Sequence, residues 1–359
     1  MIPGPGDGLR QPWVSIAESL VPRADACANY DSARRSPCES CPTSPCCSYL
    51  PLTSFRVSTL SDLDYAAYLL NFERIELGLS SAGDWSVFYR YPCRFLDRRT
   101  FACTIHNSPE QPHICRNYNP YQCWYKTALT RSSTAEYVRL DRTRLRYLMT
   151  GIGFDTRGQI LESPDWQALL EGIDNLFDGS EAPAEPEPVQ ACAPTTTTDG
   201  SFSFRQLQNP CNGCAAYCCR VLQFPIARPA EISALDYLTF CAGFPGIRIG
   251  ISDAHWLILV ETRCRHLEQN RCSVFGQSER PLVCRYFDEW RCSYKALYER
   301  PQSSGWMHIG LEEYRRVLDC VEFDASGTVL RLPAVAELRA AVQAEESLAD
   351  AGGLKAATI

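Results

Sequence analysis

The same cysteine motif occurs twice in this chain, and that duplication constrains the fold more than any other feature. "CESCPTSPCC" spans Cys38 to Cys47, and "CNGCAAYCC" spans Cys211 to Cys219. Four single cysteines follow each motif, and the last three of them are separated by eleven and then seven residues in both cases. Such matched spacing predicts that the chain consists of two homologous repeats.

Matched segments around the cysteines extend the similarity. "LDY" occurs at residues 63–65 and 235–237, "QPHICR" parallels "RPLVCR", and "FDTRGQIL" parallels "FDASGTVL". The stretch between the repeats is rich in Pro, Thr and acidic residues, so it cannot bury enough apolar surface to become ordered. The predicted organisation is a loosely ordered N-terminus (1–23), a first domain (24–177), a linker (178–200), a second domain (201–348) and a flexible tail (349–359). Each domain is expected to fold and to bind metal when it is expressed alone.

Local patterns predict a mixed fold of helices and strands. Apolar residues at helical spacing indicate helices, and runs of strand-forming residues indicate strands. Two cysteines on either side of a polar turn indicate a short hairpin. They predict helices at 58–72, 139–150, 164–177, 228–243, 311–320 and 334–348, strands at 85–91 and 256–260, and short hairpins at 93–103 and 264–272. The predicted fold class is α+β, with two homologous small cysteine-rich, metal-organised domains in pseudo-symmetric tandem.

The meaning of the twenty cysteines depends on the compartment. The first residues show no basic segment followed by an apolar one, so no secretory signal is expected and the predicted location is cytoplasmic. In a reducing compartment, patterned thiols favour metal ligation over disulfides. The chain has no run of about 20 apolar residues, so no membrane association is expected. The net charge of -7 makes nucleic-acid binding a disfavoured function.

Sixteen cysteines in the matched pattern are the candidate metal ligands. A CxxC step lets two thiolates converge on one ion, and zinc, iron and iron–sulfur clusters all accept thiolate ligands. The candidates are Cys38, Cys41, Cys46, Cys47, Cys93, Cys103, Cys115, Cys123, Cys211, Cys214, Cys218, Cys219, Cys264, Cys272, Cys284 and Cys292. Adjacent side chains point in different directions, so each vicinal pair either serves two neighbouring metals or contributes one ligand and one packing residue. The pairing of ligands stays open.

Residues other than these cysteines have smaller expected roles. None of the five histidines is matched in the other repeat, so coordination by cysteine alone is predicted, with His106 as a weaker candidate in the first repeat. Four matched arginines are expected to offset thiolate charge and to donate hydrogen bonds to sulfur or carbonyl groups: Arg94, Arg116, Arg265 and Arg285. Four cysteines outside the pattern are expected to be incidental: Cys27, Cys192, Cys241 and Cys320.

These motifs resemble the YkgJ-like family of zinc- or iron-chelating cysteine-cluster proteins, which a CxxCxxxCC opening defines. "CNGCAAYCCR" and "ERPLVCRYF" are similar to the opening of the family and to its "RPxxCR" segment. The first repeat departs from this pattern, since four residues separate Cys41 from Cys46 and Ser48 replaces the following arginine. The resemblance covers most of both repeats and implies a tandem member of the family.

The resemblance implies metal binding, with zinc, iron or an iron–sulfur cluster as the cofactor and with the metal at least partly structural. Flagellin lysine methylase has a similar cysteine signature, so an iron or iron–sulfur enzyme that modifies a protein side chain is the first alternative. A thiol redox or metal-storage module is the second. No GxGxxG follows a predicted strand and no acid/base group stands out, so no catalytic residue is assigned. Metal ions are the expected partners, and any protein substrate or partner is unidentified.

Overall fold

The computed structural model describes residues 44–118, 123–129, 133–176, 214–299, 301 and 305–343. With the gaps just given, unit 1 combines residues 44–104, 117–176, 214–220 and 262–291, and unit 2 combines residues 105–116, 221–261 and 292–343. Each compact unit therefore takes segments from both sequence repeats. The predicted N-terminus (1–23), linker (178–200) and tail (349–359) lie outside the described residues.

The first repeat supplies a five-stranded antiparallel sheet to unit 1. Its strands are β1 (Tyr49–Arg56), β2 (Ile75–Ser80), β3 (Asp84–Arg90), β4 (Ser133–Thr134) and β5 (Tyr137–Leu140). They lie in the order β1-β3-β2-β5-β4. β3 confirms the predicted strand at 85–91. β1, β2, β4 and β5 were not predicted as strands. β1 contains Pro51, and its register with β3 shifts next to this residue.

The second repeat supplies a four-stranded antiparallel sheet to unit 2. Its strands are β8 (Val221–Ile226), β9 (Ile247–Ile251), β10 (Trp256–Glu261) and β13 (Met307–Ile309). The order β8-β10-β9-β13 matches the order β1-β3-β2-β5 of the first sheet. The α+β class is therefore confirmed, and the sequence duplication is accompanied by a duplicated strand order.

Two matched helices follow the first strand of each sheet and confirm the predictions at 58–72 and 228–243. They are α3 (Leu60–Leu69) and α9 (Ile232–Ala242). Thr59 and Asp62 form a capping box at the start of α3, which satisfies backbone N–H groups that have no partner inside the helix. α9 ends where Gly243 follows it. None of the helices within the described ranges has the length and apolarity needed to cross a lipid bilayer.

The helix predicted at 139–150 begins later than expected. Arg139 and Leu140 belong to β5, where they pair with Gly78 and Leu77 of β2, and α6 spans Arg142–Thr150. Cross-strand hydrogen bonding outweighs the local helical pattern at these two residues. The other predicted helices correspond to α7 (Trp166–Asn175), α12 (Leu311–Asp319) and a helical segment at 335–343. The remainder of the helix predicted at 334–348 lies outside the described residues.

Short elements occupy the cysteine-rich segments. They are η2 (Pro45–Cys47), α4 (His113–Arg116), α5 (Trp124–Leu129), η4 (Tyr217–Cys219), β11 (Leu267–Glu268), β12 (Arg271–Cys272), α10 (Leu282–Arg285), η5 (Glu289–Arg291) and α11 (Ser293–Tyr298). The hairpin predicted at 264–272 is formed by β11 and β12. The one predicted at 93–103 is reduced to a single bridge between Leu96 and Cys103. Two further small hairpins are β6 (Gly153–Phe154) with β7 (Ile160–Glu162) and β14 (Glu322–Phe323) with β15 (Val329–Arg331).

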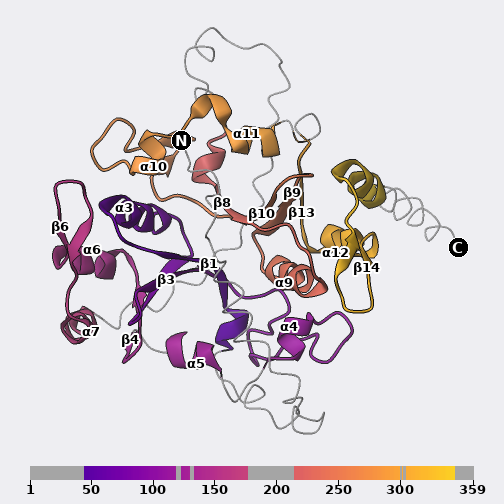
Figure 1. Cartoon of the computed structure of the whole chain (residues 1–359), viewed down its shortest axis with the longest axis horizontal. Coiled ribbons are helices and arrows are strands. Elements are labelled where there is room, and N and C mark those ends of the chain that lie inside the picture. Colours follow the sequence, from indigo (N-terminus) through magenta and orange to yellow (C-terminus); the bar gives the residue numbers. More distant parts are fainter. Residues whose placement is uncertain are drawn as a thin grey trace, which may run out of the picture. The chain divides into compact units, whose positions relative to one another are not determined.

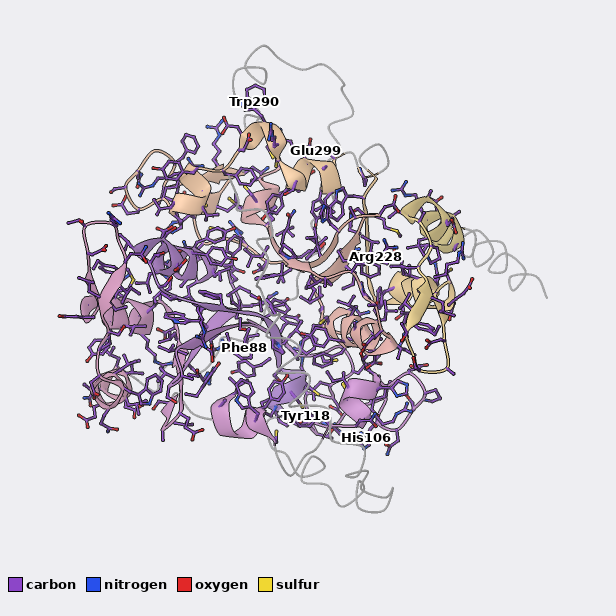
Figure 2. All side chains as sticks on the ribbon, in the orientation of Figure 1. Phe88, His106, Tyr118, Arg228, Trp290 and Glu299 are labelled. Atoms are coloured by element: carbon purple, nitrogen blue, oxygen red, sulfur yellow. The ribbon has the colours of Figure 1, made fainter. Side chains whose placement is uncertain are left out.

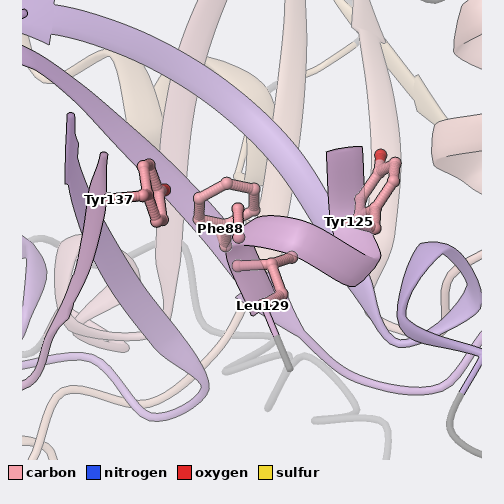
Figure 3. Close-up of a cluster of buried hydrophobic side chains, with 5 residues drawn as sticks. Phe88, Tyr125, Leu129 and Tyr137 are labelled. Carbon is pink, nitrogen blue, oxygen red and sulfur yellow. The ribbon is translucent and has the colours of Figure 1, made fainter. Parts of the chain in front are cut away.

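A cluster of buried side chains joins α5 to the sheet of unit 1. Leu129 of α5 lies beside Phe88 of β3 (Figure 3), and Tyr125 of α5 and Tyr137 of β5 belong to the same buried cluster. Phe88 is fully buried, and Trp124 stacks on it with ring centroids 5.9 Å apart. Burial of aromatic surface at this point holds α5, and therefore the segment that follows Cys123, against the sheet.

Phe88→Ala is expected to lower the free energy of unfolding by about 3–5 kcal/mol, because it leaves a cavity in a close-packed core. Urea denaturation of the full chain measures this loss. Phe275→Ala is the matched control, because Phe275 is 59% exposed and its truncation leaves no cavity. Equal losses for the two variants would contradict the assignment of this core.

Candidate functional site

Six described cysteines of the second repeat belong to unit 1, namely Cys214, Cys218, Cys219, Cys264, Cys272 and Cys284. Cys292 is the N-cap residue of α11 in unit 2, and Cys211 lies outside the described residues. Most of the predicted ligands of this repeat therefore share a compact unit with the sheet of the first repeat.

One turn of 3-10 helix, η4, presents the vicinal pair Cys218 and Cys219. Ala216 precedes it at a φ of 57°, in the left-handed region, and the matched Ser44 precedes η2 at a φ of 37°. The backbone N–H of Cys264 donates to the carbonyl of Cys219 at 2.8 Å. This bond places the vicinal pair beside the cysteine that begins the hairpin.

Five thiols interact in this region, and we call them the second-repeat thiol group: Cys218, Cys219, Cys264, Cys272 and Cys284. The thiol of Cys219 hydrogen-bonds with the sulfurs of Cys218 and Cys264. Cys284 lies close enough to interact electrostatically with Cys218, Cys264 and Cys272. Residues far apart in the sequence thus bring soft sulfur donors into one neighbourhood.

Hydrogen bonding between these thiols separates their pKa values. The bond from Cys219 lowers the pKa of Cys264 to about 7 and also lowers the pKa of Cys218. The same bonds, first that to Cys218, raise the pKa of Cys219 above its ordinary value. Burial raises the pKa of Cys284 to about 12. Thiolate character therefore develops on some sulfurs while neighbouring sulfurs hold protons, which a bound cation would displace.

Arginine side chains favour the ionised thiols. Arg142 and Arg265 act on Cys264, and Arg280 acts on Cys218 and Cys284. The expected role of Arg265 is thereby supported, and Arg94 acts on Cys93 in the same way. The sequence pattern does not single out Arg142 or Arg280, because neither directly follows a cysteine and Arg280 is matched by Gln111 in the first repeat.

The other two matched arginines bind carbonyl groups, as predicted. A guanidinium N–H of Arg116 donates to the carbonyl of Ser108 at 2.6 Å, and Arg285 donates to the carbonyl of Ser278. The prolines of the two PxxC segments also act alike, since the N–H of the cysteine donates to the proline carbonyl at 3.0 Å in both. Each PxxCR segment is therefore a tight turn that its own arginine ties to the preceding loop.

The first repeat also places most of its described pattern cysteines in unit 1. Cys46, Cys47, Cys93, Cys103 and Cys123 belong to unit 1 and Cys115 to unit 2, while Cys38 and Cys41 lie outside the described residues. The N–H of Cys93 donates to the carbonyl of Cys47 at 2.7 Å, as in the matched pair of the second repeat. Burial raises the pKa of Cys93 to about 11, and Cys103 and Cys46 also interact with it.

The donor chemistry suits a thiophilic ion, but the ligand geometry is incomplete. Zinc and iron both take thiolate sulfur, and the second-repeat thiol group supplies several such donors. Among the described residues, however, no group of three or more His, Cys, Asp or Glu side chains is arranged to hold a metal ion. Three of the sixteen candidate ligands, Cys38, Cys41 and Cys211, lie outside this part of the chain.

The cysteines outside the matched pattern lie in other surroundings. Cys241 is fully buried in α9, and the thiol of Cys320 donates to the carbonyl of Arg316 at 3.4 Å. Cys27 and Cys192 fall outside the described residues. The expected incidental role of all four cysteines stays a prediction.

Exposed aromatic side chains follow Cys284 in the sequence. Tyr286 is 78% exposed and Trp290 is 66% exposed. Figure 2 shows Trp290 projecting outward, whereas Phe88 lies inside the molecule. The chain that leads away from α10 is thus turned toward solvent, whereas Cys284 itself is partly buried.

Comparison with known proteins returned no matching family model, no matching curated protein and no matching solved structure.

Proposed function

We propose that this chain is a metal-binding protein whose two cysteine-rich repeats bind zinc or iron, with the metal at least partly structural. The observation that carries the proposal is the second-repeat thiol group, in which Cys219 hydrogen-bonds with Cys218 and Cys264. Thiols in such contact compete for protons, and a divalent cation that replaces those protons relieves the competition. The repeated spacing and the resemblance to the YkgJ-like family support the same proposal.

The sixteen patterned cysteines are the residues that would hold the metal, and their pairing into sites is left open. When bound, zinc would supply a cross-link between cysteine segments, and iron would add the capacity for electron transfer. The neighbouring arginines Arg142, Arg265 and Arg280 would offset the excess negative charge of a thiolate site. They would also favour thiolates over thiols before the metal arrives.

Elemental analysis of untagged, anaerobically purified protein tests the proposal. We expect stoichiometric zinc in a colourless sample, or iron with visible absorbance in a brown one. The second result favours the iron–sulfur alternative within the same proposal. Protein that is free of both metals, and that stays free after incubation with Zn²⁺ or Fe²⁺ under reducing conditions, would overturn metal binding. Thiols that then form disulfides reversibly would favour the thiol redox alternative.

A further inference from the structure

Two matched aspartates bind the backbone of the PxxC segments. In unit 1, the carboxylate of Asp64 in α3 accepts a hydrogen bond from the N–H of Leu282 at 2.7 Å. In unit 2, the carboxylate of Asp236 in α9 accepts hydrogen bonds from the N–H groups of His113 and Ile114, both at 2.8 Å. Figure 1 shows the corresponding pairs of helices, α10 beside α3 and α4 beside α9.

In both cases the aspartate and its partner come from different repeats. Asp64 is the middle residue of the first "LDY" and binds the PxxC segment of the second repeat. Asp236 is the middle residue of the second "LDY" and binds the PxxC segment of the first repeat. The same crosswise contact is therefore made twice, once in each unit, by residues that the duplication matches.

The contact acts close to a candidate ligand. α10 begins at Leu282, where the preceding Pro281 has no N–H group, and Cys284 is two residues further along. α4 begins at His113, and Cys115 follows Ile114 directly. Each helix has a single turn, so a carboxylate that binds its first N–H groups sets the position of the cysteine within that turn.

We propose that Asp64 and Asp236 are positioning residues, each of which holds in place the candidate ligand cysteine of the opposite repeat. Asp64 positions Cys284, and Asp236 positions Cys115. The effect of this positioning on metal binding rests on the function proposed above. The positioning itself can be measured on metal-free protein.

The two aspartates differ in a way that makes the proposal testable. Asp64 binds one N–H group through one oxygen, so an asparagine at that position can supply the same acceptor. Asp236 uses both oxygens, one for each N–H group. An asparagine at that position would turn an NH₂ group toward one of the two N–H donors. Asp64→Asn should therefore keep Cys284 in position, whereas Asp236→Asn should release Cys115.

The experiment compares full-length variants after metal removal with a chelator under reducing conditions. Asp64→Ala, Asp64→Asn, Asp236→Ala and Asp236→Asn are treated with iodoacetamide, and the alkylation rates of Cys284 and Cys115 are followed by mass spectrometry. Leu60→Ala is the control for α3, because Leu60 lies at the start of the same helix and its side chain is 45% exposed. Asp253→Ala is the control for unit 2, because the carboxylate of Asp253 accepts a hydrogen bond from a different backbone N–H, that of Val335. Metal content is measured in parallel on protein that was not stripped.

Cys284 is expected to react several-fold faster in Asp64→Ala but not in Asp64→Asn, and Cys115 several-fold faster in both variants of Asp236. The control variants should leave both rates unchanged. Cys241 is fully buried, so its alkylation rate reports global unfolding. The alkylation rates of Cys284 and Cys115 are therefore divided by that of Cys241. Unchanged relative rates in both alanine variants, or equal effects of the two asparagine variants, would overturn the proposal. Altered rates in a protein whose wild type contains no metal would retain the positioning role and reject metal binding.

Discussion

Residues 201–348 expressed alone are expected to remain largely unfolded and to bind little metal, and residues 24–177 are expected to behave likewise. Each compact unit takes segments from both repeats, so neither fragment contains a complete unit. The fragment 201–348 would lack Glu73 and Asn71, which bind the backbone on either side of Cys264. The N–H of Glu73 donates to the carbonyl of Arg263 at 2.9 Å, and the N–H of Arg265 donates to the carbonyl of Asn71 at 2.8 Å. Sequence patterns alone led to the opposite expectation, that each domain folds by itself.

Circular dichroism and elemental analysis of the separate fragments, of the co-expressed pair and of the intact chain measure this effect. Co-expression is expected to restore a folded complex with the metal content of the intact chain. A protease site inserted between residues 178 and 200 provides the matched control, because the halves should stay associated after cleavage. A monomeric, folded fragment that carries about half of the metal would show that the crosswise contacts are dispensable and that the predicted domains are independent.

Cys284→Ser and Cys214→Ser are each expected to remove about half of the bound metal from the full chain and to lower its thermal stability. Binding free energy for a structural thiolate zinc site is of the order of 10 kcal/mol and acts as folding free energy. Serine removes the soft sulfur donor with little change in volume, so loss of ligation dominates over loss of packing. Elemental analysis and thermal unfolding of the purified variants measure the two effects.

Cys192→Ser is the control for these variants, because Cys192 lies in the predicted linker and outside the matched pattern. It should change neither metal content nor thermal stability. If Cys192→Ser proved as damaging as Cys284→Ser, the division between patterned and incidental cysteines would be wrong. If none of the variants changed metal content, the assignment of these cysteines as ligands would fail.

The sequence alone was enough to predict the α+β class, the duplication and the main helices. Helices α3 and α9 follow from apolar spacing and capping signals, and strands β3 and β10 from their apolar residues; these are local properties of ten or so neighbouring residues. The strands β1, β2, β5, β8, β9 and β13 were not predicted, and Pro51 in β1 and Pro225 in β8 weaken the local strand signal. The start of α6 was misplaced because Arg139 and Leu140 find their hydrogen-bond partners across the sheet, in β2.

Only the tertiary structure decided which repeat holds which cysteine segment. Both repeats carry an aspartate in "LDY" and a PxxC segment, so the hydrogen bond between a carboxylate and a backbone N–H is chemically the same within a repeat as between repeats. No local pattern distinguishes the two pairings. The choice depends on chain connectivity and on contacts across more than a hundred residues, such as that of Asp64 with Leu282, at a separation of 218 residues. Duplication determined which groups recur in this protein, and long-range packing determined that they pair crosswise.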